Sequence, residues 1–346
     1  MASQAHDRTA APASLLARLY AGVAVTLALQ LYRLLILVGR LHARWLATQS
    51  FSSGGSAKQR EKVETYPQEA LFGYDWYVWR FMLPFMWRAD TELPARLYEA
   101  TIGQRNIEVG PGSAYFPRRS AALRRLAQRS LVASPAAAGA QLSYDLLDLN
   151  PIPLQYSHAR LERLWSVLAR DVSGAGLVPH PPTVEAYPNT RRLAADITSL
   201  EQLQSVLAAK RVEQLYDTLV ANLVIHCIPY AAVADRANGH ELARRKMAAI
   251  LTGMASLLAP AGSLVGCTVL GPRCADWTHD SAYSEAAAID ASAMLRRIGI
   301  FANEYDSLDA FTYGAKLAGL EIRVARVTGN LLTFHLVKSK PLNAKP

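Results

Sequence analysis

Residues Asn106–Pro117 read NIEVGPGSAYFP, in which an acidic residue stands between two apolar ones and two glycines one apart follow. An arginine-rich amphipathic stretch, FPRRSAALRRLAQRS, covers residues 116–130. This pattern predicts a strand, a tight turn and a helix. Glycine lets a backbone approach a ligand closely, and the free N–H groups at a helix start can bind an anion. We therefore interpret this stretch as a ligand-binding turn.

The spacing of the glycines narrows the choice of ligand. A dinucleotide fingerprint, G-x-G-x-x-G, starting from Gly110 and Gly112 would have its third glycine at position 115, where this chain has Tyr115. A phosphate-binding P-loop would continue with Gly-Lys-Ser/Thr, which does not follow here. Both of these ligand classes are therefore disfavoured.

Strand-like and helix-like segments alternate after the turn. The predicted strands cover residues 141–150, 193–196, 215–225 and 262–271, and the predicted helices between them cover 153–169, 200–208 and 241–258. Such alternation indicates a parallel sheet with helices on both faces, a three-layer α/β/α fold. Two last strands, 321–327 and 331–337, are separated by only three residues, which predicts an antiparallel terminal hairpin.

Polar side chains stand at the carboxyl ends of four predicted strands, namely Glu108, Asp148, Asp196 and Asn222. An open parallel sheet binds ligands beyond these ends, at the switch point beside its first strand. A carboxylate at the end of the second strand can accept both hydroxyls of a ribose, so Asp148 is the strongest single candidate. Asp196 could accept from an exocyclic purine amine, with Ile197 offering a backbone group and an apolar contact.

The charge of the chain is uneven. Its first 60 residues hold seven Arg or Lys and one Asp, which accounts for +6 of the net +9. The remainder is only weakly basic, so we expect no nucleic-acid partner. The three cysteines form no C-x-x-C motif, which favours a reducing compartment and disfavours a metal site.

Residues 1–49 are predicted to be a membrane-anchor or targeting helix. The window 19–39 contains a single charge, Arg33, over a length that could span a bilayer. On a helix, four arginines fall within an arc of about 80°, which also suits a helix lying in the membrane surface. They are Arg18, Arg33, Arg40 and Arg44.

A leader that is poor in acids and rich in arginine is also typical of mitochondrial import signals, which is the alternative. We expect membrane contact through residues 14–46, a polar linker over 50–65 and an intracellular catalytic body after it.

The stretch 72–87, FGYDWYVWRFMLPFMW, has eight aromatic residues in sixteen positions. One interpretation is the core-facing stripe of a helix. The other is an aromatic helical lid over residues 66–103 that closes over a flat or cationic ligand, with Tyr74 and Trp76 as candidates.

Taken together, the ordered motifs resemble the class I S-adenosylmethionine-dependent methyltransferases. That family has an acid followed by G-x-G-x-G and a Rossmann-like seven-stranded sheet that ends in an antiparallel hairpin. The resemblance is to small-molecule methyltransferases of microbial and fungal pathways, through segments such as YDWYVWRFMLPFMWR, LLDLNP, ANLVIHCIP, LVGCTVLG and GIFANEYDSLDAF. It covers about residues 70–340, and 104–346 would form the methyltransferase domain with S-adenosylmethionine as cofactor.

The resemblance implies roles for the residues of the turn. Glu108 would hold the amino group of the cofactor, and the backbone of Gly110, Gly112 and Ser113 would pass beside its methionine moiety. The third glycine of the motif is replaced by Ala114. That replacement is mild if the φ angle of Ala114 is negative.

The nucleoside would be bound at the ends of the next two strands. The resemblance implies that Asp148 contacts the ribose and that Leu149 and Asn150 lie near the adenine edge. Asp196 and Ile197 would frame the adenine.

Asn222 and Leu223 would line the floor of the site, and Tyr74 would close it from above. His226 could act as a general base, with Asp75 and His279 as weaker alternatives, if the acceptor needs one.

An insertion over residues 272–305, rich in alanine and containing aromatic residues, suits an apolar or aromatic acceptor. The expected function is O-, N- or C-methylation of a small, lipophilic metabolite by a membrane-tethered enzyme. The alternative is a catalytically silent protein that binds the cofactor and acts as a scaffold or regulator at a membrane.

Overall fold

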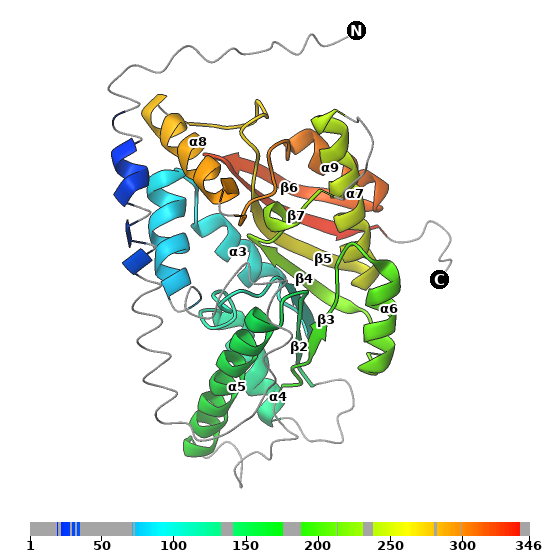
Figure 1. Cartoon of the computed structure of the whole chain (residues 1–346). Coiled ribbons are helices and arrows are strands. Elements are labelled where there is room, and N and C mark those ends of the chain that lie inside the picture. Colours follow the sequence, from blue (N-terminus) through cyan, green and yellow to red (C-terminus); the bar gives the residue numbers. More distant parts are fainter. Residues whose placement is uncertain are drawn as a thin grey trace, which may run out of the picture.

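The computed structural model describes residues 71, 73–132, 141–175, 188–212, 214–230, 238–279, 282–297 and 299–339, with 19, 22–27, 30–31 and 33–34 near the N-terminus (Figure 1). The predicted linker, 50–65, and most of the predicted membrane contact, 14–46, lie outside these residues.

A seven-stranded sheet forms the middle of the molecule, in the order β3-β2-β1-β4-β5-β7-β6. Its strands are β1 (Arg105–Val109), β2 (Ser143–Asp148), β3 (Arg192–Ala194), β4 (Tyr216–Asn222), β5 (Leu258–Val269), β6 (Leu320–Thr328) and β7 (Leu331–Lys338). The first five strands are parallel, and β7 runs antiparallel to both β5 and β6. The predicted Rossmann-like topology and its terminal hairpin are confirmed.

The order of the strands reverses at β1, which pairs with β2 on one side and with β4 on the other. The chain therefore leaves the carboxyl ends of β1 and β4 in opposite directions. This divergence opens a crevice at that edge of the sheet, which is where open α/β sheets bind ligands.

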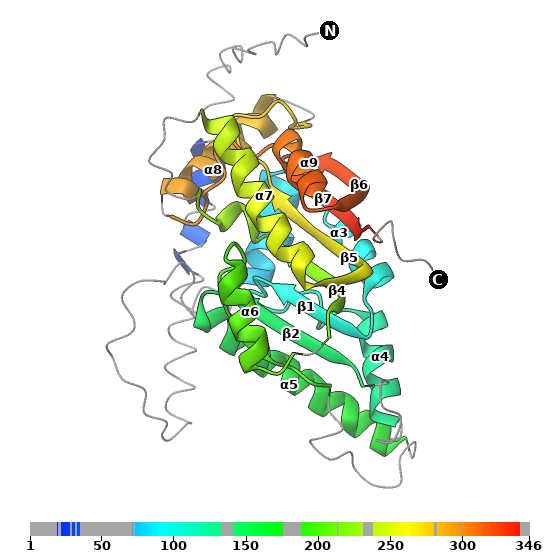
Figure 2. The same cartoon turned by 90° about the vertical axis from the view of Figure 1, so that its right-hand side faces the viewer.

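Helices cover both faces of the sheet (Figure 2). One face carries α3 (Glu92–Thr101), α4 (Ala121–Val132) and α5 (Pro151–Gly174), and the other carries α6 (Leu200–Ala209), α7 (Gly239–Leu257) and α9 (Leu308–Leu317). Alternate strand residues belong to different cores, because successive side chains of a strand point to opposite faces. In β4, for example, Val220 packs with α3–α5 and Leu219 packs with α6, α7 and α9.

The helix after the glycine turn begins later than the sequence suggested. Residues 116–119 form turns, and α4 starts at Ala121. The backbone N–H groups of Ala121 and Ala122 donate to the two carboxylate oxygens of Glu99, at 3.0 and 2.9 Å. An anion at this helix start is therefore supplied by the protein itself, and the prediction that these N–H groups are free for a ligand is wrong.

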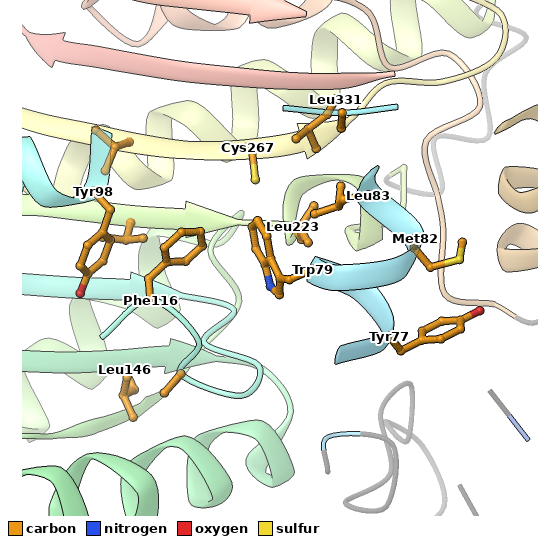
Figure 3. Packing of buried hydrophobic residues seen from close by; sticks show 14 of the residues in the cluster. Tyr77, Trp79, Met82, Leu83, Tyr98, Phe116, Leu146, Leu223, Cys267 and Leu331 are labelled. Atoms are coloured by element: carbon orange, nitrogen blue, oxygen red, sulfur yellow. The ribbon is translucent and has the colours of Figure 1, made fainter. Parts of the chain in front are cut away.

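The aromatic stretch forms η2 (Asp75–Met86), a helix with π-type hydrogen bonding that we call the lid helix. Its buried residues belong to the hydrophobic core on this side of the sheet, and they are Tyr77, Trp79, Met82, Leu83 and Met86. Figure 3 shows Trp79 between Phe116 and Leu223, whereas Tyr77 and Met82 point away from the sheet. The core-stripe interpretation thus holds for these residues. Trp76 is 49% exposed and faces away from the core. The later part of the predicted lid, α3, packs on β5 and β7 instead.

The insertion between β5 and α9 contains α8 (Ala282–Arg297), which packs against the lid helix. No helix in the described part of the chain has the length and apolar character needed to cross a bilayer. In the N-terminal helical stretch, Ala24, Val25 and Leu31 pack against the core. A second set on that stretch is exposed, and it comprises Leu19, Val23, Leu27 and Leu34.

Candidate functional site

A cavity of about 560 Å³ lies at the carboxyl ends of β1, β2, β3 and β4. Its volume falls within the roughly 300–1,000 Å³ typical of small-molecule sites. The residues that end these strands form its base, α7 forms one wall, and Leu71 and Tyr74 close it from the side of the lid helix. The cavity therefore lies at the edge of the sheet where the sequence analysis expected a ligand site.

The glycine turn forms the part of the wall that follows β1. Gly110 and Gly112 have φ angles of +63° and +51°, a region that glycine adopts without strain. A Cβ atom on Gly110 would lie 2.4 Å from Cγ2 of Val224, so only glycine permits this close approach of the turns after β1 and β4.

Ala114 does not have the negative φ angle that would make its replacement of the third glycine mild. Its φ is +53°, the left-handed conformation that costs an L-residue roughly 1–2 kcal/mol. A hydrogen bond from its N–H to the Pro111 carbonyl, at 2.8 Å, holds the conformation. Three residues of the turn, Gly110, Gly112 and Ala114, are therefore left-handed although only two of them are glycine.

Glu108 does not line the cavity. It is 3% exposed and lies on the sheet face opposite to Ile107 and Val109, where its Oε2 accepts a hydrogen bond from the Tyr144 hydroxyl at 3.0 Å. The Tyr144 hydroxyl also lies 2.9 Å from that of Tyr98. Burial raises the pKa of Glu108 to about 8. The carboxyl group of Glu108 points into the protein, so any hold on the amino group of a cofactor would act through the glycine turn and not by direct contact.

The cavity does bring together the nucleoside-binding residues predicted at the end of the second strand, Asp148, Leu149 and Asn150. The Asn150 N–H donates to Asp148 Oδ1 at 2.8 Å, and burial raises the pKa of Asp148 to about 6. Asn150 Oδ1 accepts from the Ile152 N–H at 2.9 Å and so caps α5. The buried Nδ2 of Asn150 has no hydrogen-bond partner among the described residues. The wall beside Leu149 thus has a carboxylate that accepts hydrogen bonds from the backbone of Leu149 and Asn150, and one donor without a partner among the described residues.

The end of β3 supplies the next part of the wall. Oδ1 of Asp196 accepts from the backbone N–H and the hydroxyl of Thr198, at 2.8 and 2.7 Å. Ile197, which is buried, and Ala195 lie beside it in the lining. This turn holds Asp196 at the cavity, where the sequence analysis placed it. The second carboxylate oxygen of Asp196 takes no part in these two hydrogen bonds.

Two predicted ligand contacts lie away from the cavity lining. The Ser113 hydroxyl donates to Asp75, and the Asn222 Oδ1 lies 3.5 Å from the Cys267 sulfur. The neighbouring Leu223 does line the cavity, with a φ of +57°. Tyr74 lines it from above, and its Cε1 lies 4.0 Å from where a Cβ on Gly112 would be.

The predicted base, His226, is 3% exposed and is not part of the lining. Its Nδ1 accepts a hydrogen bond from the Val269 N–H at 3.2 Å and lies 3.3 Å from the Thr268 hydroxyl, and its ring contacts Phe301 edge-on. Burial and the nearby Lys246 lower its pKa to about 3. A neutral imidazole whose Nδ1 already accepts carries its proton on Nε2, so a role as general base is not supported.

The weaker alternatives, Asp75 and His279, do not line the cavity either. Asp75 binds Ser113 and two arginines, and His279 contacts the Trp277 ring edge-on at 5.4 Å. Within the described part of the chain, no group of His, Cys, Asp or Glu residues could hold a metal ion.

Sequence reasoning missed the wall contributed by α7. Its lining residues follow the i, i+3, i+4, i+7 spacing of one helix face, and they are Leu242, Arg245, Lys246 and Ala249. Lys246 is buried and donates to Asp306 Oδ2 and to the Ala302 carbonyl, both at 2.7 Å. The spacing was visible in the sequence, but nothing there indicated that this face of the helix meets the cavity.

No protein-family model matches the sequence. A curated relative, O-methyltransferase NEC2 from Pyricularia oryzae, is 28% identical over 263 residues, which cover 74% of this chain and 84% of the relative.

Two solved structures are also similar. The N-methyltransferase NodS from Bradyrhizobium japonicum is 14% identical with a TM-score of 0.38, over 72% of this chain and 94% of NodS. An O-methyltransferase family protein from Burkholderia thailandensis is 14% identical with a TM-score of 0.44, over 80% of this chain and 62% of that one. These scores are too low for either structure to indicate what this chain acts on.

Proposed function

We propose that this chain, a class I S-adenosylmethionine-dependent methyltransferase, methylates an oxygen atom of a small and largely apolar metabolite. The observation that carries the proposal is the cavity at the strand ends, bounded by the left-handed glycine turn and by Asp148. The relative named as an O-methyltransferase supports oxygen as the methylated atom.

The residues of the cavity fit the cofactor. Asp148 would accept hydrogen bonds from ribose hydroxyls, and the unpartnered Nδ2 of Asn150 would donate to the nucleoside. The backbone of Gly110 and Gly112 leaves room for the methionine part, because neither residue has a side chain. When bound, S-adenosylmethionine supplies an electrophilic methyl group on a sulfonium.

The protein's contribution to the reaction is alignment and exclusion of water. Tyr74 covers the glycine turn, and the face of an aromatic ring attracts a cation such as a sulfonium. Leu71 and Leu223 add apolar contacts that exclude water from the same cavity. These residues position and shield the reacting atoms and transfer no proton.

The environment of His226 bears on the class of acceptor. Because its Nδ1 already accepts from the backbone of β5, it is not free to deprotonate a weakly acidic alcohol. We therefore propose a phenolic or enolic hydroxyl, which is far more acidic than an aliphatic alcohol and can lose its proton to solvent without a strong base. Phe301, which packs on His226, lies in the insertion whose composition suits an apolar acceptor.

We further propose that the N-terminal segment lies on a membrane surface. Leu19, Val23, Leu27 and Leu34 are all exposed and fall within an arc of about 80° on a helix. The excess of +6 in the first 60 residues adds attraction to anionic lipid. Deleting residues 1–60 should abolish flotation with anionic vesicles and leave cofactor binding unchanged. If the truncated protein still floats, this membrane contact is wrong.

Calorimetry with S-adenosylhomocysteine, followed by transfer of a labelled methyl group to a panel of phenols, enols and amines, tests the proposal. We expect binding, and transfer to hydroxyl acceptors. A catalytically silent scaffold would bind the nucleoside and transfer nothing to any acceptor. Absence of binding would refute the cofactor site itself.

A further inference from the structure

Asp75 is the first residue of the lid helix and directly follows Tyr74, which lines the cavity. Its carboxylate receives hydrogen bonds from two other parts of the fold. Oδ1 accepts from the Ser113 hydroxyl in the glycine turn, and Oδ2 accepts from Arg160 Nη2 at 3.3 Å and from Arg118 Nη1 at 3.4 Å. We call these four residues, Asp75, Ser113, Arg118 and Arg160, the Asp75 cluster.

The cluster also ties the glycine turn to α5. Nη1 of Arg160 donates to the Ser113 carbonyl at 2.7 Å, so one guanidinium contacts both Asp75 and the turn. One helical turn earlier in α5, the Ser157 hydroxyl donates to the Gly112 carbonyl at 2.8 Å. The lid helix, the glycine turn and α5 therefore meet at one junction.

The environment of this junction differs from that of a surface ion pair. The side chains of Asp75 and Arg160 are 25% and 21% exposed, whereas those of the pair Asp309 and Arg244 are 69% and 42% exposed. Charge-assisted hydrogen bonds that are partly shielded from water fix geometry more firmly than exposed ones do. Asp309 therefore provides a matched control, an aspartate paired with arginine far from the lid helix.

We propose that Asp75 is a positioning residue that holds the first turn of the lid helix, and with it the ring of Tyr74, over the cofactor cavity. The inference rests on the proposed function, because it assigns Asp75 to the binding of that cofactor. Asp75 does not line the cavity and acts through its neighbour, so it is not a catalytic residue.

Loss of the junction should loosen the start of the lid helix and leave the rest in place. Trp79, one turn further on, stacks on Tyr115 with ring centroids 4.9 Å apart and meets Phe116 edge-on at 4.7 Å (Figure 3 shows Trp79 and Phe116). These buried contacts are independent of Asp75. An Asp75→Asn variant should therefore fold, with a disturbance limited to residues near the cavity.

The test compares wild-type protein, Asp75→Asn and the control Asp309→Asn. Isothermal calorimetry with S-adenosylhomocysteine should give a dissociation constant at least about tenfold higher for Asp75→Asn, the order expected from losing a charged hydrogen bond, and unchanged for Asp309→Asn. Hydrogen exchange without ligand should quicken over residues 73–78 and 110–114 in Asp75→Asn and not in Asp309→Asn. Arg160→Gln should reproduce both effects, and the double variant should add little to either single change.

A wild-type dissociation constant in Asp75→Asn would overturn the inference, and so would exchange that quickens equally over the whole chain. If the wild-type protein binds no S-adenosylhomocysteine, the proposed function fails. The exchange comparison would still decide whether Asp75 holds the lid helix, since it needs no ligand.

Discussion

Lowering the pH through 6 should weaken cofactor binding through Asp148. Burial raises the pKa of this carboxyl to about 6 in the free protein. Hydroxyl donors of a bound ribose favour the ionised form and should return that pKa to a lower value. Binding then requires the carboxylate, and a protonated Asp148 must first lose its proton.

The size of the effect follows from that pKa. At pH 7 about nine in ten Asp148 side chains are ionised, whereas at pH 5 only about one in eleven is. If the bound pKa lies well below 5, the apparent dissociation constant should rise about tenfold between pH 7 and pH 5, or about 1.4 kcal/mol. Replacement by asparagine should weaken binding at pH 7 by about 1.5–3 kcal/mol, the cost of a charged hydrogen bond.

The assay is calorimetry with S-adenosylhomocysteine between pH 5 and 7, where the amino group of the ligand stays protonated. Asp148→Asn should show a flat profile over this window, because it has no proton to lose. Ligand binding to the wild type should release protons near pH 6, which calorimetry in two buffers of different ionisation enthalpy measures. This proton release should be absent in Asp148→Asn. A flat wild-type profile, or an equal slope in Asp148→Asn, would refute the assignment of Asp148.

Three other predictions concern the surroundings of the cavity. Gly110→Ala should lower the urea midpoint of unfolding more than Gly112→Ala does. In both variants an alanine must adopt a left-handed backbone at a cost of roughly 1–2 kcal/mol, but only Gly110→Ala also places a Cβ against Val224. Equal midpoints for the two variants would contradict this. His226→Asn should keep the pH profile of kcat between pH 5 and 8, because His226 transfers no proton. His226→Ala should cost about 1–3 kcal/mol of stability, because it leaves the buried N–H of Val269 unpaired. Loss of one limb of the kcat–pH profile in the asparagine variant would instead indicate that His226 is a base. Glu108 has a pKa of about 8 in the folded protein against an ordinary 4.5, so its contribution to the stability of the fold is complete below pH 4.5 and is lost as the pH rises through 8. In Glu108→Gln the thermal midpoint should therefore change less between pH 5 and 9 than in the wild type. Parallel curves of midpoint against pH in the two proteins would exclude this role of Glu108.

The topology of the sheet could be predicted because each of its determinants is local. Alternating apolar segments mark the strands, and the three residues 328–330 force the last two strands to pair as a hairpin. The same reasoning located Asp148 and Asp196, since a residue that ends a parallel strand has nowhere to lie except at that edge of the sheet.

The residues that the sequence analysis misplaced or missed differ in whether the sequence could have located them. Glu108 follows Ile107 and precedes Val109, both of which face α7, so strand alternation alone sends its carboxyl to the other face. That direction could have been predicted. The bond between Asp75 and Ser113 joins positions 38 residues apart, and the one between Lys246 and Asp306 joins positions 60 apart. No periodicity encodes such pairs.

The strained residues indicate why the cavity exists where it does. Ala114 and Leu223 adopt left-handed backbone in the turns after β1 and β4, the two strands at the switch point. Each conformation costs roughly 1–2 kcal/mol and is held by a backbone hydrogen bond of 2.8 Å, from Ala114 to Pro111 and from Leu223 to Cys267. Both turns border the cavity, through Gly110 and Gly112 after β1 and through Leu223 and Val224 after β4. The Asp75 cluster attaches the lid helix to the first of these turns. The same turn therefore contributes Gly110 and Gly112 to the cavity wall and, through Ser113, holds the helix that follows Tyr74.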